Sequence, residues 1–160
     1  MTQRVELATV MDRLAVDETV TEYAVAVDDG DWTAYRGLFT ADGWADYRSA
    51  GGIEGEAGRV AGWLAESMES FGTRQHLIVN RRVRFGIHEH DTGDTARVRA
   101  DYVNPMRLAG DGGSGGPDLV CGGRYEFGLL RTPDGWRLSR VVAHEKWRRT
   151  PEPGPAAVPG

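Results

Sequence analysis

The feature that most constrains the fold is a change in the spacing of apolar residues after residue 71. Before it, apolar residues recur every three or four positions, as in amphipathic helices, and after it they alternate with polar residues, as in strands. We therefore predict helices over residues 5–28, 31–39 and 55–71, and strands over residues 43–49, 74–85, 95–108, 119–131 and 135–147. Helices followed by a run of antiparallel strands indicate an α+β fold, with the helices on one face of the sheet.

The predicted sheet is expected to curve, because "VCGGRYEFG" places two adjacent glycines inside a strand, which is typical of a bulge. A curved sheet covered by helices encloses a pocket, the usual place for a small ligand. Residues 1–149 are expected to form a single domain, whereas the proline-rich segment 150–160 is expected to be a disordered tail. The glycine-rich segment 109–118 is interpreted as a hairpin loop that could cover the pocket.

Composition excludes several classes of partner. The 160 residues carry a net charge of −5, so no basic field favours binding to nucleic acid or to an anionic membrane. A single cysteine, Cys121, rules out an internal disulfide and suits a reducing compartment. Neither a signal peptide nor an apolar run of about 20 residues is recognisable. We therefore expect a cytoplasmic protein whose partner is a small molecule.

Three aspartates near the end of the first predicted helix have different expected roles. At about 100° per residue, Asp29 falls on the charged face of the helix. Asp31 follows Gly30 and is placed to cap the next helix. Asp28 lies at the border of the apolar stripe and is the aspartate expected to face the interior. It could serve as a carboxylate bound to a nearby arginine or as part of a catalytic pair.

Of the four histidines, His76 is the strongest candidate for a site, because it begins the apolar strand "HLIV". An aspartate beside it would fix its tautomer and make it a general base, although a structural strand-end histidine is the simpler interpretation. His88 and His90 flank a polar turn and form only a weak metal motif, and His144 could face either way. We predict neither a metal site nor a cofactor, and the sequence contains no Walker, GxSxG, HExxH or dinucleotide-binding motif.

Strand alternation groups the remaining polar residues. Arg124 and Glu126 share one face of their strand, with Tyr125 and its apolar neighbours on the other face. One interpretation pairs Arg124 with Glu126 on the solvated side of the sheet; the other places both in the pocket, where arginine would hold a carboxylate or enolate oxygen. Tyr102 and Met106 share a face of the preceding strand with Ala100 and Asn104.

With these elements in place, the chain resembles the SnoaL-like domains of the nuclear transport factor two-like superfamily, in the branch of scytalone dehydratase and hexachlorocyclohexane dehydrochlorinase. The resemblance covers about residues 8–148 and rests on the order of four segments: "EYAVAVDDGDWTAYRGLF", "DYRS", "TRQHLIVN" and "DGWRLSRVVAHEKW". It implies a cone-shaped fold in which a curved antiparallel or mixed sheet and about three N-terminal helices enclose a pocket. The pocket would hold an Asp–His dyad.

The resemblance assigns the dyad to Asp28 and His76, and it assigns to Tyr47 the role of holding the water that polarises a substrate carbonyl. The chain departs from scytalone dehydratase elsewhere. Its second water-holding tyrosine is replaced by Val27, a pocket histidine by Met106, and a serine and an asparagine by Arg124 and Glu126. The expected substrate-binding residues are Val27, Trp44, Tyr47, Tyr102, Met106, Arg124 and Glu126. The exchanges favour a more polar or anionic ligand than scytalone.

Two functions follow from this resemblance. The first is a cofactor-independent lyase or isomerase in which His76 abstracts a proton and Tyr47 and Arg124 stabilise the developing oxyanion; dehydratase-like elimination and polyketide-type cyclisation share this step. The second is a non-catalytic ligand-binding or structural subunit, like the small subunit of a ring-hydroxylating dioxygenase. We also expect a homodimer or homotrimer, as the resemblance implies.

Overall fold

The computed structural model describes residues 2–88, 91–110 and 115–150. The helices are α1 (Thr2–Asp29), α2 (Trp32–Gly37) and α3 (Ala57–Met68), with a short 3-10 turn η1 (Arg48–Ala50). The strands are β1 (Phe39–Asp46), β2 (Glu54–Glu56), β3 (Phe71–Arg74), β4 (Leu77–His88), β5 (Asp91–Leu108), β6 (Leu119–Thr132) and β7 (Gly135–Arg149). His90, the middle of the 109–118 loop and nearly all of the predicted 150–160 tail lie outside the described residues.

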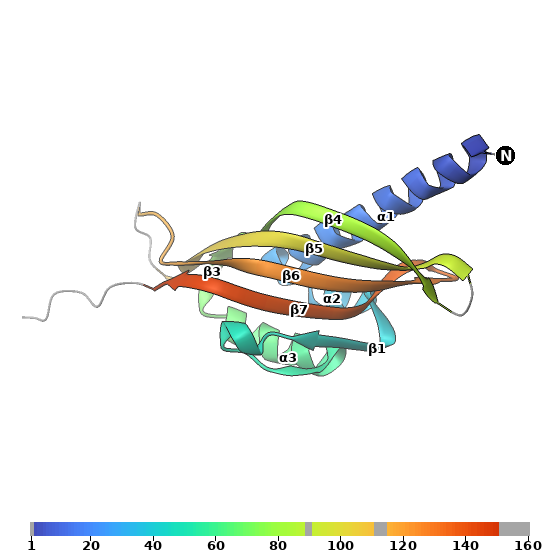
Figure 1. Ribbon diagram of the computed structural model, residues 1–160. Helices are drawn as coiled ribbons and strands as arrows, with labels where there is room; N and C mark the ends of the chain where they lie inside the picture. The colour runs from blue at the N-terminus through green and yellow to red at the C-terminus, as the bar shows by residue number, and fades with distance from the viewer. Residues whose placement is uncertain (1, 89–90, 111–114, 151–160) are drawn as a thin grey trace, which may run out of the picture.

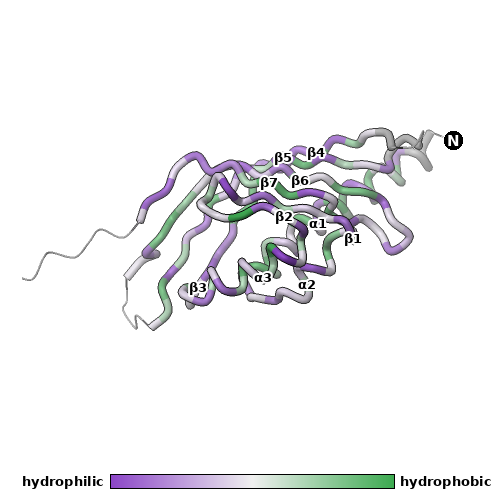
Figure 2. Tube along the Cα trace, turned by 90° about the horizontal axis from the view of Figure 1, so that it is seen from below, coloured by the Kyte–Doolittle hydropathy of each residue, from purple (hydrophilic) through white to green (hydrophobic). Residues whose placement is uncertain are grey.

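The strands form one mixed sheet in the order β2-β1-β7-β6-β5-β3, and β4 also pairs with β5. All pairings are antiparallel except that between β1 and β7, which is parallel. The sheet curls, and α2 and α3 lie against its inner side while α1 crosses behind it (Figure 1). The view from below shows these helices inside the curve of the sheet (Figure 2). The predicted α+β cone is therefore confirmed.

The core lies between the helices and the inner face of the long strands. Alternation on β5 and β6 turns one side of each strand inward, and the helices contribute apolar stripes spaced by three and four residues. The large, fully buried side chains that join these elements are Val16, Val20, Tyr23, Tyr35, Val60, Val98, Phe127, Leu129, Leu138 and Val141. The first turns of α1 extend beyond the sheet (Figure 1), so the apolar side chains of Leu7, Met11 and Leu14 remain exposed.

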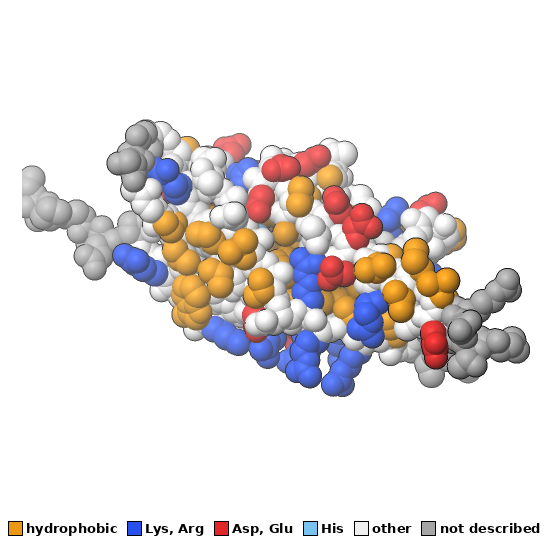
Figure 3. Space-filling view, turned by 90° about the horizontal axis from the view of Figure 1, so that it is seen from above, with side chains coloured by type: hydrophobic (Ala, Val, Ile, Leu, Met, Phe, Trp, Pro, Cys, Tyr) orange, Lys and Arg blue, Asp and Glu red, His pale blue; other side chains and the backbone are white. Residues whose placement is uncertain are grey.

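The outer face of β4 and β5 carries a cluster of four arginines. Arg82 on β4 lies opposite Arg99 on β5, and Arg84 lies opposite Arg97, with all four side chains exposed. In the view from above, charged side chains of both signs lie between two groups of hydrophobic side chains (Figure 3). Because like charges in opposite positions weaken strand pairing, the inner face supplies the stabilisation of this part of the sheet.

The end of α1 follows the sequence prediction. Gly30 adopts a positive φ of 69°, which stops the helix at Asp29. The side chain of Asp31 accepts a hydrogen bond of 2.9 Å from the backbone N–H of Ala34 and caps α2. Asp29 is exposed, whereas the side chain of Asp28 is partly buried. The expected orientations of the three aspartates are therefore confirmed.

The predicted bulge also occurs: the register between β6 and β7 shifts between Gly122 and Gly123. The short strands β2 and β3 were not predicted, and β1 begins earlier than the expected strand over residues 43–49. Each of the two missed strands has three or four residues, too few for a period of two to be recognised. In the described part of the chain, no helix is long and apolar enough to cross a membrane.

Candidate active site

A cavity of about 90 Å³ lies between the inner face of the sheet and helices α1 and α3. Its lining is mainly aromatic and aliphatic, with a few polar groups: Tyr23, Val27, Tyr47, Ala50, Trp63, Leu64, Met68, His76, Tyr102, Asn104, Met106, Cys121, Tyr125, Ala143, Glu145 and Arg148. An apolar cavity with few convergent polar groups is typical of a site for a small organic ligand.

His76 lies in the chain between β3 and β4, where its ring reaches the cavity. Its Nδ1 is 2.6 Å from Oδ1 of Asp28, and its backbone N–H points at both oxygens of the same carboxylate, at 3.0 and 2.9 Å. The side chain of His76 is only 6% exposed. Because a carboxylate can only accept, Nδ1 carries a proton, and in the neutral ring Nε2 then keeps its lone pair. The second ring nitrogen is therefore available to a ligand.

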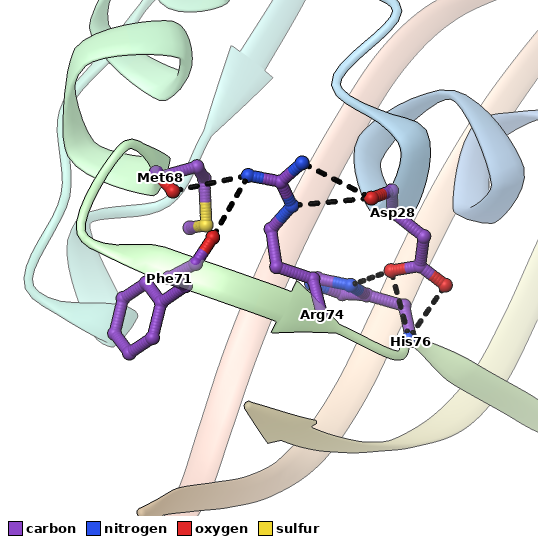
Figure 4. A network of polar contacts seen from close by, with 5 residues as sticks. All are labelled: Asp28, Met68, Phe71, Arg74 and His76. Atoms are coloured by element: carbon purple, nitrogen blue, oxygen red, sulfur yellow. Dashed lines mark hydrogen bonds and ion pairs between the residues drawn. The ribbon is translucent and has the colours of Figure 1, made fainter. Parts of the chain in front are cut away.

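Arg74 holds the segments around this pair. Its guanidinium donates to the backbone carbonyl of Asp28 from Nε at 3.2 Å and from Nη2 at 3.1 Å. Nη1 donates to the carbonyls of Met68, at 3.0 Å, and of Phe71, at 3.4 Å. The arginine thus joins the end of α1, the end of α3 and the start of β3 beside the dyad (Figure 4). A cation is favoured here because helix C-termini carry partial negative charge.

Three tyrosine hydroxyls form a hydrogen-bonded group on the cavity wall. Tyr47 Oη lies 2.5 Å from Tyr23 Oη and 3.0 Å from Tyr35 Oη. Burial raises the pKa of Tyr23 and of Tyr47 well above 10, so both phenols remain protonated near neutral pH. Tyr23 and Tyr47 line the cavity, whereas Tyr35 lies behind them. The group therefore presents neutral O–H groups to a ligand.

The hydroxyl of Tyr47 lies between those of Tyr23 and Tyr35 and has one proton, so at least one of these two neighbours donates to it. The hydroxyl of Tyr23 also interacts with that of Tyr125 on β6. The phenols therefore form a connected group, and Tyr23, Tyr47 and Tyr125 of this group line the cavity.

The remaining polar groups lie on β5, β6 and β7. Burial raises the pKa of the Cys121 thiol, which disfavours the nucleophilic thiolate. Glu145 and Arg148 form a pair in which Nε and Nη2 each donate to a carboxylate oxygen at 2.8 Å. This pair raises the pKa of Arg148 and neutralises its charge locally. In the described part of the chain, no group of three or more His, Cys, Asp or Glu side chains could hold a metal ion.

Four of the expected substrate-binding residues, Val27, Tyr47, Tyr102 and Met106, line the cavity. The placement of the other three is corrected by the structure. Arg124 points to the outer face of the sheet, where its Nε donates to Asp101 at 2.9 Å, and Glu126 pairs there with Arg99 at 3.3 Å.

The physical reason for this placement is the alternation of β6. Tyr125 and Phe127 occupy the inner face, so the residues on either side of Tyr125 must point outward. The interpretation that put Arg124 and Glu126 in the pocket is therefore wrong, and they lie on the outer side of the sheet without pairing with each other. His144 also lies on the outer face, 4.0 Å from Glu126.

Trp44 is the third correction. Its neighbours Gly43 and Ala45 on β1 are buried, while the Trp44 side chain is among the exposed large hydrophobics, at 37%. The same alternation that buries Ala45 turns Trp44 away from the cavity.

Several cavity residues were not among the predicted site residues, most importantly Tyr23 and Asn104. Tyr23 lies one helical turn before Val27 and supplies a phenol beside Tyr47, although its position in the apolar stripe indicated only a core residue. Asn104 shares its strand face with Tyr102 and Met106, and this alternation was the signal that could have placed it in the site.

Comparisons with known proteins agree with this fold. The family described as SnoaL-like domain matches residues 8–142. An uncharacterized protein of Mycobacterium tuberculosis is 35% identical over 136 residues, which cover 85% of this chain and 86% of that protein. A hexachlorocyclohexane dehydrochlorinase, LinA-type3, from Novosphingobium barchaimii aligns with a TM-score of 0.74 at 16% identity, over 97% of this chain and 99% of that one.

A protein of Novosphingobium aromaticivorans, proposed to be a scytalone dehydratase, aligns with a TM-score of 0.73 at 17% identity, over 99% of this chain and all of the other. The curled sheet and its cavity thus define an α+β cone, the fold that these structural neighbours share. Within that class, the chain belongs to the SnoaL-like domain family.

Proposed function

We propose that this protein is a cofactor-independent lyase or isomerase in which His76 removes a proton from a small organic substrate. One observation carries the proposal: the His76 ring lies between the Asp28 carboxylate, at 2.6 Å from Nδ1, and the cavity. Asp28 selects the tautomer with a free lone pair on Nε2 and stabilises the imidazolium that forms. The pair is thus arranged as a general base facing a ligand site.

The tyrosine group on the cavity wall supports the same reaction. A proton next to a carbonyl becomes acidic when the oxygen that gains negative charge receives a hydrogen bond. Tyr23 and Tyr47 are neutral donors on the wall of the cavity that also contains His76. They take the role that Arg124, on the outer face, cannot fill.

In the proposed reaction, the C–H electron pair forms a new carbon–carbon double bond while the proton moves to Nε2. A leaving group on the neighbouring carbon departs with its bonding electrons, and a departing hydroxyl takes the proton back from His76 as water. The two distant structural neighbours are named for eliminations of this kind, a dehydrochlorination and a dehydration. Return of the proton to a different carbon would instead give an isomerisation.

The test is exchange of carbon-bound hydrogen for deuterium in D2O, followed by NMR over a panel of small carbonyl compounds and β-hydroxy ketones. We expect His76→Gln to lower the exchange rate by about 10²- to 10⁴-fold. The matched control is His144→Gln, an exposed histidine on the outer face, which should leave the rate unchanged. Equal rates in the wild type and His76→Gln for every compound that exchanges would refute the proposed base.

The alternative, a non-catalytic ligand-binding or structural subunit, leaves the Asp28–His76 pair without a chemical role. It predicts that no compound of the panel exchanges and that the chain copurifies with a large oxygenase subunit. Deuterium exchange on the panel and copurification from the native host together distinguish the two functions.

A further inference from the structure

One polar atom in the cavity has no partner. Asn104 lies on β5 between the cavity residues Tyr102 and Met106 and is 4% exposed. Its side-chain oxygen, Oδ1, forms no hydrogen bond with any described residue. A buried acceptor without a donor is costly, because it has lost water without compensation. An unsatisfied acceptor in the wall of a ligand site indicates that the ligand supplies the missing hydrogen-bond donor.

The other side of the amide is occupied. Asn104 hydrogen-bonds toward Cys121 and Tyr125 on β6, and this contact lowers the pKa of both groups against the raising effect of burial. Because Oδ1 makes no hydrogen bond with any described residue, the atom of the amide that contacts these groups is the nitrogen, which donates. The pairing therefore orients the amide and leaves the oxygen as the free atom.

The charges of the lining restrict the ligand further. Among the described residues that line the cavity, Arg148 is the only arginine or lysine, and Glu145 neutralises it through two hydrogen bonds of 2.8 Å. The other side chains are mostly aromatic or aliphatic. An anionic group would lose its hydration without gaining an unpaired cation, so the lining favours a neutral ligand.

We infer that Asn104 is a specificity-determining residue that accepts a hydrogen bond from an O–H or N–H group of a neutral substrate. This inference rests on the proposed function, since it names the class of molecule on which His76 acts. Asn104 and His76 line one cavity, so the contact at Asn104 orients the substrate relative to Nε2 of His76. A substrate without such a donor leaves Oδ1 unsatisfied and is discriminated against.

The experiment compares phenol with toluene, two probes of nearly the same shape of which only phenol has a donor. Binding of each is measured by calorimetry to the wild type, to Asn104→Leu and to the control Met106→Leu. We expect Asn104→Leu to lower the ratio of phenol to toluene affinity by about three- to tenfold, the effect of one neutral hydrogen bond. Met106→Leu alters the shape of the same wall without a polar group and should change both affinities alike.

A second measurement needs no substitution. Phenol, but not toluene, should shift the ¹⁵N and ¹H signals of the Asn104 side-chain amide. The inference is overturned if the wild type does not bind phenol, if Asn104→Leu leaves the affinity ratio unchanged, or if the amide signals do not respond. None of these measurements requires turnover, so they fail or succeed independently of the role of His76.

Discussion

The carboxylate of Asp28 holds both the ring and the backbone of His76. Oδ1 lies 2.6 Å from Nδ1, and the backbone N–H of His76 is 3.0 and 2.9 Å from the two oxygens. The residues are 48 positions apart, at the end of α1 and just before β4. This double contact limits rotation of the imidazole, so that the nitrogen facing the cavity is determined by a residue outside the cavity lining.

Asp28→Asn should change the tautomer of His76. An amide in place of the carboxylate can donate to Nδ1, which then accepts, so the ring proton moves to Nε2. A base with a protonated Nε2 cannot take a substrate proton, and we expect deuterium exchange to fall by about tenfold or more. ¹⁵N NMR of the imidazole reports the tautomer directly. An unchanged tautomer in Asp28→Asn would show that the carboxylate does not control it.

Arg74→Gln should loosen the support of the dyad. The substitution removes the donors to the carbonyls of Asp28, Met68 and Phe71 and leaves orphan acceptors at the ends of two helices. We expect the free energy of unfolding to fall by about 1–3 kcal/mol in urea denaturation. Arg36→Gln is the control, because Arg36 makes one exposed contact of 3.4 Å, to Trp32, and its loss should cost less than about 0.5 kcal/mol. Equal losses in the two variants would argue against the support role.

Gly123→Ala should destabilise the bulge between β6 and β7. A Cβ at this position would meet the backbone oxygen of His144, which cannot move away as a flexible side chain could. We expect a cost of about 1–3 kcal/mol in the free energy of unfolding. Gly62→Ala is the counterpart: the new methyl group in α3 meets nothing within 4 Å, and the helix should gain about 0.5–1 kcal/mol. In thermal denaturation, the melting temperature should therefore fall in Gly123→Ala and rise in Gly62→Ala.

Alkaline pH should unfold the protein cooperatively. All five tyrosines are buried, and burial raises the pKa of each, in the case of Tyr125 to about 12. Below about pH 10, folded and unfolded chains both keep these protons. Above it only the unfolded chain releases them, so the free energy of unfolding falls as pH rises.

The expected loss is about 1 kcal/mol per pH unit for each tyrosine that ionises only after unfolding. Tyrosinate absorbance should therefore appear together with the loss of circular dichroism, and Tyr102→Phe should reduce the slope. Tyrosinate absorbance that appears near pH 10 while the fold persists would contradict the burial of these phenols.

The local pattern of apolar and polar residues was sufficient to predict much of the fold. The apolar spacing placed the three helices and the four long strands, and the helical geometry separated Asp28 from Asp29 and Asp31. Short-range physics controls these features, because the 3.6-residue and two-residue periods and the capping hydrogen bonds involve near neighbours in the chain. The strands β2 and β3 escaped prediction because they form only through their partners β1 and β5.

By itself, the sequence determined which residues share a face, including Arg124 with Glu126 and Tyr102 with Asn104. Only the tertiary structure decided which face looks inward, because alternation is the same whichever side the helices cover. It placed Arg124 and Glu126 outside and Asn104 inside, and it brought Tyr23, Tyr35 and Tyr47 together from α1, α2 and the end of β1. Hydrogen bonds between distant segments depend on the curl of the whole sheet, and no local period encodes that curl.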